Sequence, residues 1–235
     1  MDKSLSIFFP CYNDEGTIAS MVISASITAK DLKIPDYEII VVNDGSSDDS
    51  LQILENLQNK YPELKIVNHK KNKGYGGALI SGFTNASKSL IFYTDGDAQY
   101  DVKELKLLYN KYLKTNADVV NGYKIDRKDP IHRIIIGKIY NNFVKFMFGI
   151  KIKDVDCDFR LMKKEIFNTV KLTQNSGVIC VEMIKKIQDA KFKFSEVAVN
   201  HYSRTHGKSQ FFNFKRIFDV GCGLIKLWLN LVIFP

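Results

Sequence analysis

The chain has 235 residues, 45% of them hydrophobic, which is enough apolar material for one sizeable core. Its four cysteines are scattered and form no Cys-x-x-Cys pair, so they indicate neither a disulfide framework nor a zinc site and fit a reducing compartment. The first residues lead directly into a short apolar run without the pattern of a signal peptide. We therefore expect the protein in the cytosol, at the cytosolic face of a membrane.

The net charge of +8 resides in the second half of the chain. Residues 1–120 hold 13 Lys and Arg against 16 Asp and Glu, whereas residues 121–235 hold 21 against 10. A basic half is suited to phosphates, nucleic acid or an anionic membrane, and it also occurs as a plain solvated surface. Charge alone does not choose among these.

The first half of the chain alternates between strand and helix patterns. Short β-rich runs predict strands at residues 5–10, 37–43, 64–68, 91–94 and 118–122. Stretches of helical character lie between them, at residues 17–30, 47–61, 76–86 and 102–115. Nearly unbroken apolar strands in such an alternation predict an α/β fold, with a mostly parallel central sheet flanked by helices.

Two apolar segments follow in the second half. Residues 131–149 place apolar side chains at helical spacing with basic residues between them, and residues 211–235 are rich in aromatic and aliphatic side chains. We expect one domain over residues 1–210 and an apolar C-terminal helix over residues 211–235. The cleanest apolar part of the tail is shorter than the ~20 residues needed to span a bilayer. Packing on the core and contact with a membrane interface both remain open for these helices.

Polar clusters follow the predicted strands at residues 12–15, 43–46, 72–77 and 95–99. Ligands of such sheets bind beyond the carboxyl ends of the strands, so the four clusters are expected to meet at one edge. Asp95 and Asp97 can share a hard divalent cation there, Mg²⁺ or Mn²⁺, and Gln99 can add an amide oxygen. The alternative is an ordinary turn, in which Asp and Gly are common.

The neighbouring clusters are suited to holding a nucleotide. The Asp44 carboxylate can accept hydrogen bonds from a base or a ribose hydroxyl, although its segment is also turn-like in composition. The loop at residues 73–77 can bring backbone N–H groups and Lys73 to a phosphate. His69, His132 and His201 show no metal-ligand spacing and are interpreted as structural or surface residues.

Two charged segments lie further along the chain. Asp154, Asp156 and Asp158 alternate, so in an extended segment their carboxylates would face one side and could supply a base. Residues 204–209 form a basic loop of the kind that closes over phosphates. A solvated acidic strand and an ordinary surface loop are the alternatives.

The order of these motifs resembles the family-2 inverting glycosyltransferases of GT-A fold, in particular dolichol-phosphate mannose synthase and bacterial polyprenyl-phosphate sugar transferases. The matching segments are Pro10-Cys11-Tyr12-Asn13-Asp14, Asn43-Asp44-Gly45-Ser46, Asp95-Gly96-Asp97 with Gln99, Gly122-Tyr123-Lys124, Asp158-Phe159-Arg160 and residues 204–210. The family usually has other residues at four places, occupied here by Asp14, Asn43, Lys124 and Gln210.

The resemblance and the clusters described above together suggest a role for each candidate residue. The nucleotide would be held by Pro10, Tyr12, Asp14, Asp44, Lys73, Asp95 and Lys124. A Mg²⁺ or Mn²⁺ ion would be held by Asp95, Asp97 and Gln99. The candidate base is Asp158, with Asp156 as substitute. Phosphate and acceptor contacts are expected from Arg127, Arg133, Arg160, Arg204, His206, Lys208 and Ser209.

The implied reaction is the metal-dependent transfer of a hexose, with inversion, from a GDP- or UDP-sugar to an acceptor. A polyprenyl or dolichyl phosphate is the expected acceptor, which goes with peripheral membrane contact and with no nucleic acid partner. A saccharide hydroxyl as acceptor, and a non-catalytic nucleotide-binding protein on the same scaffold, are the alternatives. The sequence leaves the sugar, the base and the oligomeric state open.

Overall fold

A computed structural model of the chain describes residues 4–206 and 214–234. Seven strands form one sheet in the order β3-β2-β1-β4-β6-β5-β7. In chain order they are β1 (Ser4–Cys11), β2 (Asp36–Asn43), β3 (Leu64–Asn68), β4 (Leu90–Thr94), β5 (Val119–Ile125), β6 (Phe159–Lys163) and β7 (Phe194–Asn200). All neighbouring strands pair in parallel except β6, which runs antiparallel to both β4 and β5. The predicted mostly parallel sheet is confirmed.

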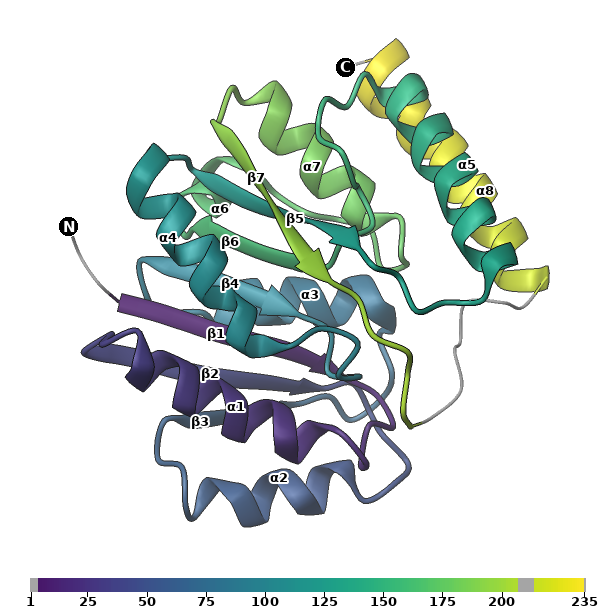
Figure 1. Ribbon diagram of the computed structural model, residues 1–235. Coiled ribbons are helices and arrows are strands. Elements are labelled where there is room, and N and C mark those ends of the chain that lie inside the picture. Colours follow the sequence, from purple (N-terminus) through teal and green to yellow (C-terminus); the bar gives the residue numbers. More distant parts are fainter. Residues whose placement is uncertain (1–3, 207–213, 235) are drawn as a thin grey trace.

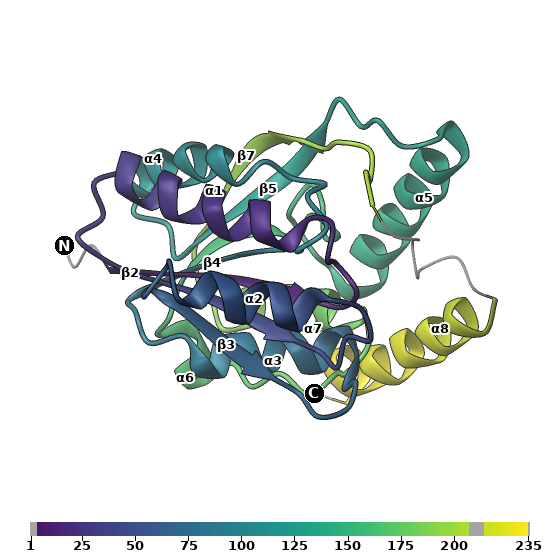
Figure 2. The same cartoon turned by 90° about the horizontal axis from the view of Figure 1, so that it is seen from below.

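Helices cover both faces of the sheet (Figures 1 and 2). The helices are α1 (Ile18–Asp31), α2 (Ser50–Gln58), α3 (Gly74–Asn85), the 3-10 turn η1 (Val102–Glu104), α4 (Leu105–Thr115), α5 (Ile131–Phe148), α6 (Ile166–Thr169), α7 (Ile179–Asp189), α8 (Phe214–Trp228) and the π-helical segment η2 (Leu229–Ile233). One face is covered by α1, α2 and α4, and the other by α3, α6 and α7.

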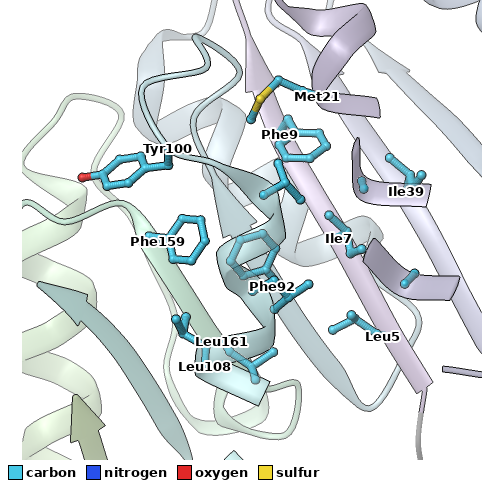
Figure 3. Packing of buried hydrophobic residues seen from close by; sticks show 14 of the residues in the cluster. Leu5, Ile7, Phe9, Met21, Ile39, Phe92, Tyr100, Leu108, Phe159 and Leu161 are labelled. Atoms are coloured by element: carbon cyan, nitrogen blue, oxygen red, sulfur yellow. The ribbon is translucent and has the colours of Figure 1, made fainter. Parts of the chain in front are cut away.

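The central strands are apolar on both sides because each face packs under helices. In β1, Leu5, Ile7 and Phe9 belong to the cluster beneath α1 and α4, and Phe8 belongs to the cluster on the opposite face. Figure 3 shows the first of these clusters, in which the ring of Phe92 on β4 lies next to that of Phe159 on β6. This two-sided burial explains why β1, β2 and β4 are recognisable from the sequence.

A third cluster lies beside the sheet, where α5, α7 and α8 pack together through Val144, Phe148, Val181, Ile184, Leu224 and Leu227. The indole N–H of Trp228 also donates to the Met147 carbonyl oxygen (2.9 Å). In Figure 2, α5 and α8 converge toward α7 and diverge away from the sheet. Among the residues that the structure describes, no helix combines the length and apolarity needed to cross a membrane.

Candidate active site

The four polar clusters meet at the carboxyl edge of the sheet, as predicted. The loop after β1 binds the loop after β2, because the Asn13 side chain accepts from the Ser47 N–H (2.8 Å). The loop after β1 also binds the segment after β4 through the Thr17 hydroxyl, which donates to the Gly96 carbonyl oxygen (2.8 Å). The start of α3 joins the same segment through the Tyr75 hydroxyl, which donates to Asp95 Oδ1 (2.8 Å).

The first of these loops places Pro10, Tyr12 and Asp14 beside the Asp95-Gly96-Asp97 segment. A Cβ atom on Gly96 would lie 2.8 Å from the Pro10 carbonyl oxygen and 3.5 Å from Asp14 Oδ2, so only glycine allows this approach. The Asp14 carboxylate accepts from the Tyr12 N–H (3.0 Å). Burial raises the pKa of Asp14 to about 6, and the nearby Asp97 adds to this against the Tyr12 N–H and Arg204.

The Asp44 carboxylate is 3% exposed and is held by two groups. Its Oδ1 atom accepts from the Lys73 backbone N–H (2.8 Å) and from His69 Nδ1 (2.6 Å). His69 Nε2 lies 2.8 Å from the Ser81 hydroxyl. The interpretation of His69 as structural or surface therefore misses its contact with a predicted nucleotide-binding residue.

The loop that begins α3 has three of its backbone N–H groups engaged within the protein: Lys73 donates to Asp44, Gly74 to Asn72 Oδ1 (2.9 Å) and Gly76 to the Asn175 carbonyl oxygen (2.9 Å). Residues 174–175 lie so close to Gly76 that a Cβ atom would collide with them. The phosphate contact of this loop stays a prediction. The Lys73 side chain is exposed, and its phosphate contact stays a prediction.

The positive groups around Asp95 and Asp97 do not balance the negative charge of these two carboxylates. Burial, with Asp158 and Asp97 nearby, raises the pKa of Asp95 well above its ordinary value. Burial also raises the pKa of Asp97, although Arg204 forms an ion pair with it and opposes the shift. A divalent cation would relieve this repulsion, so the two hard oxygen ligands fit the implied Mg²⁺ or Mn²⁺ ion.

The described residues contain no group of three or more Asp, Glu, His or Cys side chains arranged to hold a metal ion. Two carboxylates are nevertheless sufficient for a cation of this kind, because Mg²⁺ commonly binds one or two carboxylates together with substrate phosphates. Gln99 stays a predicted ligand. Its side-chain N–H donates to the Tyr202 carbonyl oxygen (3.1 Å), and its backbone carbonyl oxygen accepts from the Tyr202 N–H (2.9 Å). Gln99 therefore also holds the segment that contains Arg204.

Asp158 faces the same site, with one carboxylate oxygen fixed by three donors. Its Oδ1 atom accepts from the Tyr93 hydroxyl (3.0 Å), from Arg160 (3.0 Å) and from the Cys180 thiol (3.2 Å). No hydrogen bond to Oδ2 occurs within the part of the chain that the structure describes. This arrangement fixes Oδ1 of the candidate base and leaves Oδ2 without a donor among the described residues.

Arg160 is 0% exposed, so the prediction that it contacts phosphate is wrong. Its guanidinium donates to Asn121 Oδ1 (2.6 Å), to Asp158 (3.0 Å), to the Tyr93 hydroxyl and to the Val155 carbonyl oxygen. The reason is its place in β6, between β4 and β5, where its side chain has protein on every side. Arg160 therefore holds the acidic segment and cannot reach a ligand.

The acidic segment is a turn that precedes β6, not the extended strand that we considered. Asp154, Asp156 and Asp158 are nevertheless all half-buried, with Val155 and Cys157 fully buried between them. Burial raises the pKa of Asp156 to about 6; the nearby Lys124 opposes this shift, and Asp158 and Asp154 add to it. The neighbouring carboxylates therefore influence Asp156 although the segment is not extended.

Lys124 binds this acidic segment. Its ammonium donates to the Asp156 carbonyl oxygen (2.7 Å) and lies 3.6 Å from Asp154 Oδ1. The neighbouring carboxylates, Asp154 first, raise the pKa of Lys124 in spite of its burial. The prediction that Lys124 contacts donor phosphates is not tested by this arrangement.

The remaining basic residues lie around the site with different surroundings. Arg127 forms an ion pair with Asp129 (2.9 Å) in the loop before α5, and Arg133 is half-buried on α5. His206 is exposed and its ring lies against Gly16. Lys208 and Ser209, which we also predicted to bind phosphate, lie outside the described residues.

The sequence model described as Glycosyl transferase family 2 matches residues 6–171 of the chain. The chain belongs to this family. The matched region includes the loops after β1, β2 and β4 as well as Asp158. The predicted family is therefore confirmed.

Related proteins carry names from lipid-linked sugar chemistry. The chain is 28% identical to the undecaprenyl-phosphate 4-deoxy-4-formamido-L-arabinose transferase of Yersinia enterocolitica, over 89% of this chain and 63% of that protein. It is 26% identical to the dodecaprenyl-phosphate galacturonate synthase of Rhizobium johnstonii, over 95% of this chain and 66% of that protein. The chain thus spans slightly less than two thirds of the length of these family 2 relatives.

Solved structures confirm the fold. The glucosyl-3-phosphoglycerate synthase of Mycobacterium tuberculosis, in complex with Mn²⁺, UDP and glucosyl-3-phosphoglycerate, superposes with a TM-score of 0.72 at 15% identity, over 99% of this chain and 81% of that one. Residues 1–349 of S. aureus TarS in complex with UDP-GlcNAc superpose with a TM-score of 0.65 at 17% identity, over 97% of this chain and 67% of that one. The family 2 chain shares the GT-A fold of these glycosyltransferases.

Sequence reasoning missed four side chains that support the predicted ones: His69, Tyr75, Tyr93 and Cys180. Tyr75 lies within the polar cluster after β3, so its cluster did indicate the site. Tyr93 lies inside an apolar strand and Cys180 inside α7, and neither position carries a signal. Their contacts with Asp158 depend on the fold alone.

We expect the metal-free protein to unfold at a higher temperature at about pH 5 than at about pH 7. The raised pKa values of Asp14 and Asp156, both about 6, mean that the folded state keeps protons that the unfolded chain releases. Stability is therefore lost as the pH rises through about 4 to 6. Burial lowers the pKa of His201 to about 4, so this one residue acts in the opposite direction and stabilises the folded state as the pH rises.

Thermal unfolding in the presence of a chelator, across this pH range, measures the effect. The double substitution D14N/D156N should flatten the dependence, whereas Asp31→Asn, at the exposed end of α1, should leave it unchanged. A melting temperature that rises steadily with pH in the chelated wild type would contradict the expected charge imbalance.

Proposed function

We propose that this protein transfers a hexose from a nucleotide sugar to a polyprenyl phosphate, with inversion and with a divalent cation. The observation that carries the proposal is the convergence of Asp44, Asp95, Asp97 and Asp158 on one edge of the sheet, with Arg204 paired to Asp97. The names of the two relatives, both transferases or synthases of polyprenyl-phosphate sugars, support this choice of acceptor.

The donor half of the reaction uses the loops after β1, β2 and β4. Tyr12 and Asp14 would contact the base, and Asp44 would accept from the base or the ribose with the oxygen that His69 leaves free. Asp95 and Asp97 would hold the Mg²⁺ or Mn²⁺ ion, which when bound neutralises charge on the diphosphate leaving group. UDP is the first nucleotide to test, because the two neighbouring structures contain UDP or a UDP-sugar.

The acceptor half needs orientation more than proton removal. An oxygen of the lipid phosphate, already anionic, would form the new bond to the anomeric carbon as the bond from that carbon to the diphosphate oxygen breaks. Asp158 could direct its free Oδ2 atom to the cation, because a carboxylate has no proton to donate to an anionic phosphate. Arg204, released from Asp97 when the cation binds there, would be available to the phosphates.

One observation favours a saccharide hydroxyl as the alternative acceptor. A hydroxyl must lose its proton, and Asp156, with its pKa raised to about 6, is suited to take it near neutral pH. The two acceptors therefore differ in their need for Asp156.

Substitution of Asp156 by Asn should distinguish them. Transfer to undecaprenyl phosphate should stay within a few-fold of the wild type, because no base is required. Transfer to a hydroxyl should fall by about 10²-fold, the usual contribution of a general base. The measurement is transfer of labelled sugar from UDP- and GDP-sugars with Mn²⁺ or Mg²⁺, with Asp189→Asn on the exposed end of α7 as control. Product on a saccharide but none on the lipid phosphate would overturn the proposed acceptor.

We also propose that α5 and α8 contact a membrane. Large apolar side chains are exposed on both helices, among them Phe146 (89%), Ile131 (76%) and Phe218 (71%). Helix α5 contains no acidic residue and carries Arg133, Lys138 and Lys145. Apolar and basic residues together are typical of helices that lie in the interface of anionic membranes. Both helices lie on the side toward which the parallel strands point, which is the side of the site (Figure 1).

Vesicle flotation tests this surface. The wild type should float with vesicles that contain anionic lipid, and the double substitution I139S/F146S should reduce the bound fraction by at least about tenfold, since two large apolar anchors are removed. Leu113→Ser, on the exposed side of α4, is the matched control and should float like the wild type. Equal flotation of the double variant would refute the assignment of this face.

A further inference from the structure

The nucleotide-binding role proposed for Asp44 depends on which of its oxygens is available. This carboxylate is almost fully buried, and its Oδ1 atom accepts from the Lys73 N–H and from His69 Nδ1. A third contact fixes its backbone, because the Asn72 side chain donates to the Asp44 carbonyl oxygen (3.1 Å). Within the part of the chain that the structure describes, Oδ2 forms no hydrogen bond.

His69 is itself held from the other side. Its ring is buried just after β3, and Nε2 lies 2.8 Å from the hydroxyl of Ser81 on α3. An ionised carboxylate can only accept, so Nδ1 carries the proton toward Asp44. The ring thus connects α3 to the end of β2 through two hydrogen bonds, at 2.6 and 2.8 Å.

We infer that His69 is a positioning residue for the nucleotide: it turns the Asp44 carboxylate so that Oδ2 faces the donor. The inference rests on the proposed donor-binding function and deepens it. His69 touches no substrate in this role and acts through Asp44. The contact at 2.6 Å is the only hydrogen bond from a side chain to the Asp44 carboxylate among the described residues, so its loss would leave a buried carboxylate held by the Lys73 N–H alone.

The consequence is a specific loss of nucleotide affinity. Without His69 the Asp44 carboxylate can rotate. The hydrogen bond that the nucleotide donates to this charged carboxylate is then weakened or lost. The dissociation constant for UDP or GDP should rise roughly tenfold, with KM for the donor rising in parallel and kcat changing little. The KM for the acceptor should not change, because Asp158 and its partners are independent of His69.

A double-mutant cycle separates this role from a structural one. We would measure UDP and GDP binding by calorimetry with Mn²⁺ present for wild type, H69A, D44A and the double variant, together with the melting temperature of each. If His69 acts through Asp44, its loss adds nothing once Asp44 is absent, so the double variant binds like D44A. His69→Asn keeps a donor near the place of Nδ1 and should restore much of the affinity, which also covers the case that H69A does not fold.

The outcomes are distinguishable. Weak binding by D44A with wild-type binding by H69A and His69→Asn would overturn the positioning role and leave the proposed function intact. Wild-type binding by D44A would remove Asp44, and hence His69, from the proposed donor site. Additive losses in the double variant would show that His69 acts elsewhere. His132→Asn, an exposed imidazole on α5, is the control and should bind like the wild type.

Discussion

Asp97→Asn should abolish metal-dependent transfer and at the same time raise the melting temperature of the metal-free protein. The loss follows because the substitution removes one of the two carboxylates proposed to hold the cation. Electrostatic groups at a leaving group contribute about 10²- to 10³-fold to the rate, so kcat/KM should fall by about 10³-fold. The gain in stability has a separate cause in the folded protein.

That cause is the direction of the pKa shift. The Asp97 pKa is raised even though Arg204 forms an ion pair with it, so burial and the neighbouring Asp158 outweigh the ion pair. Neutralising Asp97 therefore removes a net unfavourable charge. The balance resembles other functional sites, where groups gathered for a ligand destabilise the empty protein.

Two measurements check this prediction: donor transfer with Mn²⁺ or Mg²⁺, and thermal unfolding in the presence of a chelator. Asp31→Asn, exposed at the end of α1, controls for the loss of one negative charge and should change neither. Retention of more than about a tenth of the transfer rate by Asp97→Asn would contradict the metal assignment. A lower melting temperature would show instead that the Arg204 ion pair dominates.

The first half of the fold follows from the sequence because its strands are buried on both faces. β1, β2 and β4 each contain a run of buried apolar residues, and the polar residues that follow these runs mark where each strand ends. β6 and β7 were not predicted. β6 contains Arg160 and Lys163, and β7 is a half-buried edge strand, so neither shows an unbroken apolar run. Their identity depends on pairing with β5, which no local pattern reveals.

The candidate site likewise has one part that the sequence predicts and one part that it does not. Asp44, Asp95 and Asp97 follow strands, so the topological rule brings them together without a structure. The groups that orient these carboxylates come from elements distant in sequence, and local pattern cannot pair them. Arg160 shows why closeness in sequence is not enough to assign a residue to the site. It lies two residues from Asp158, yet its side chain belongs to the core.

Arg160→Leu should destabilise the protein by about 3–5 kcal/mol, the range observed when one partner of a buried ion pair is removed. The substitution leaves the Asp158 carboxylate without its cation and deprives Asn121 and the Val155 carbonyl oxygen of donors. At roughly 2–4 °C per kcal/mol for a chain of this size, the melting temperature should fall by about 6–20 °C. The double variant R160L/D158N should recover part of the loss, because it no longer buries an uncompensated charge.

Lys163→Leu provides the matched control on the same strand. Lys163 pairs with Asp118 (2.9 Å) near the surface, where such pairs contribute about 1 kcal/mol at most. If Arg160 instead bound phosphate, Arg160→Leu would weaken nucleotide or acceptor binding at an unchanged melting temperature. The predicted pattern is the reverse: a large fall in stability, with transfer by the remaining folded protein reduced only through the disturbed orientation of Asp158.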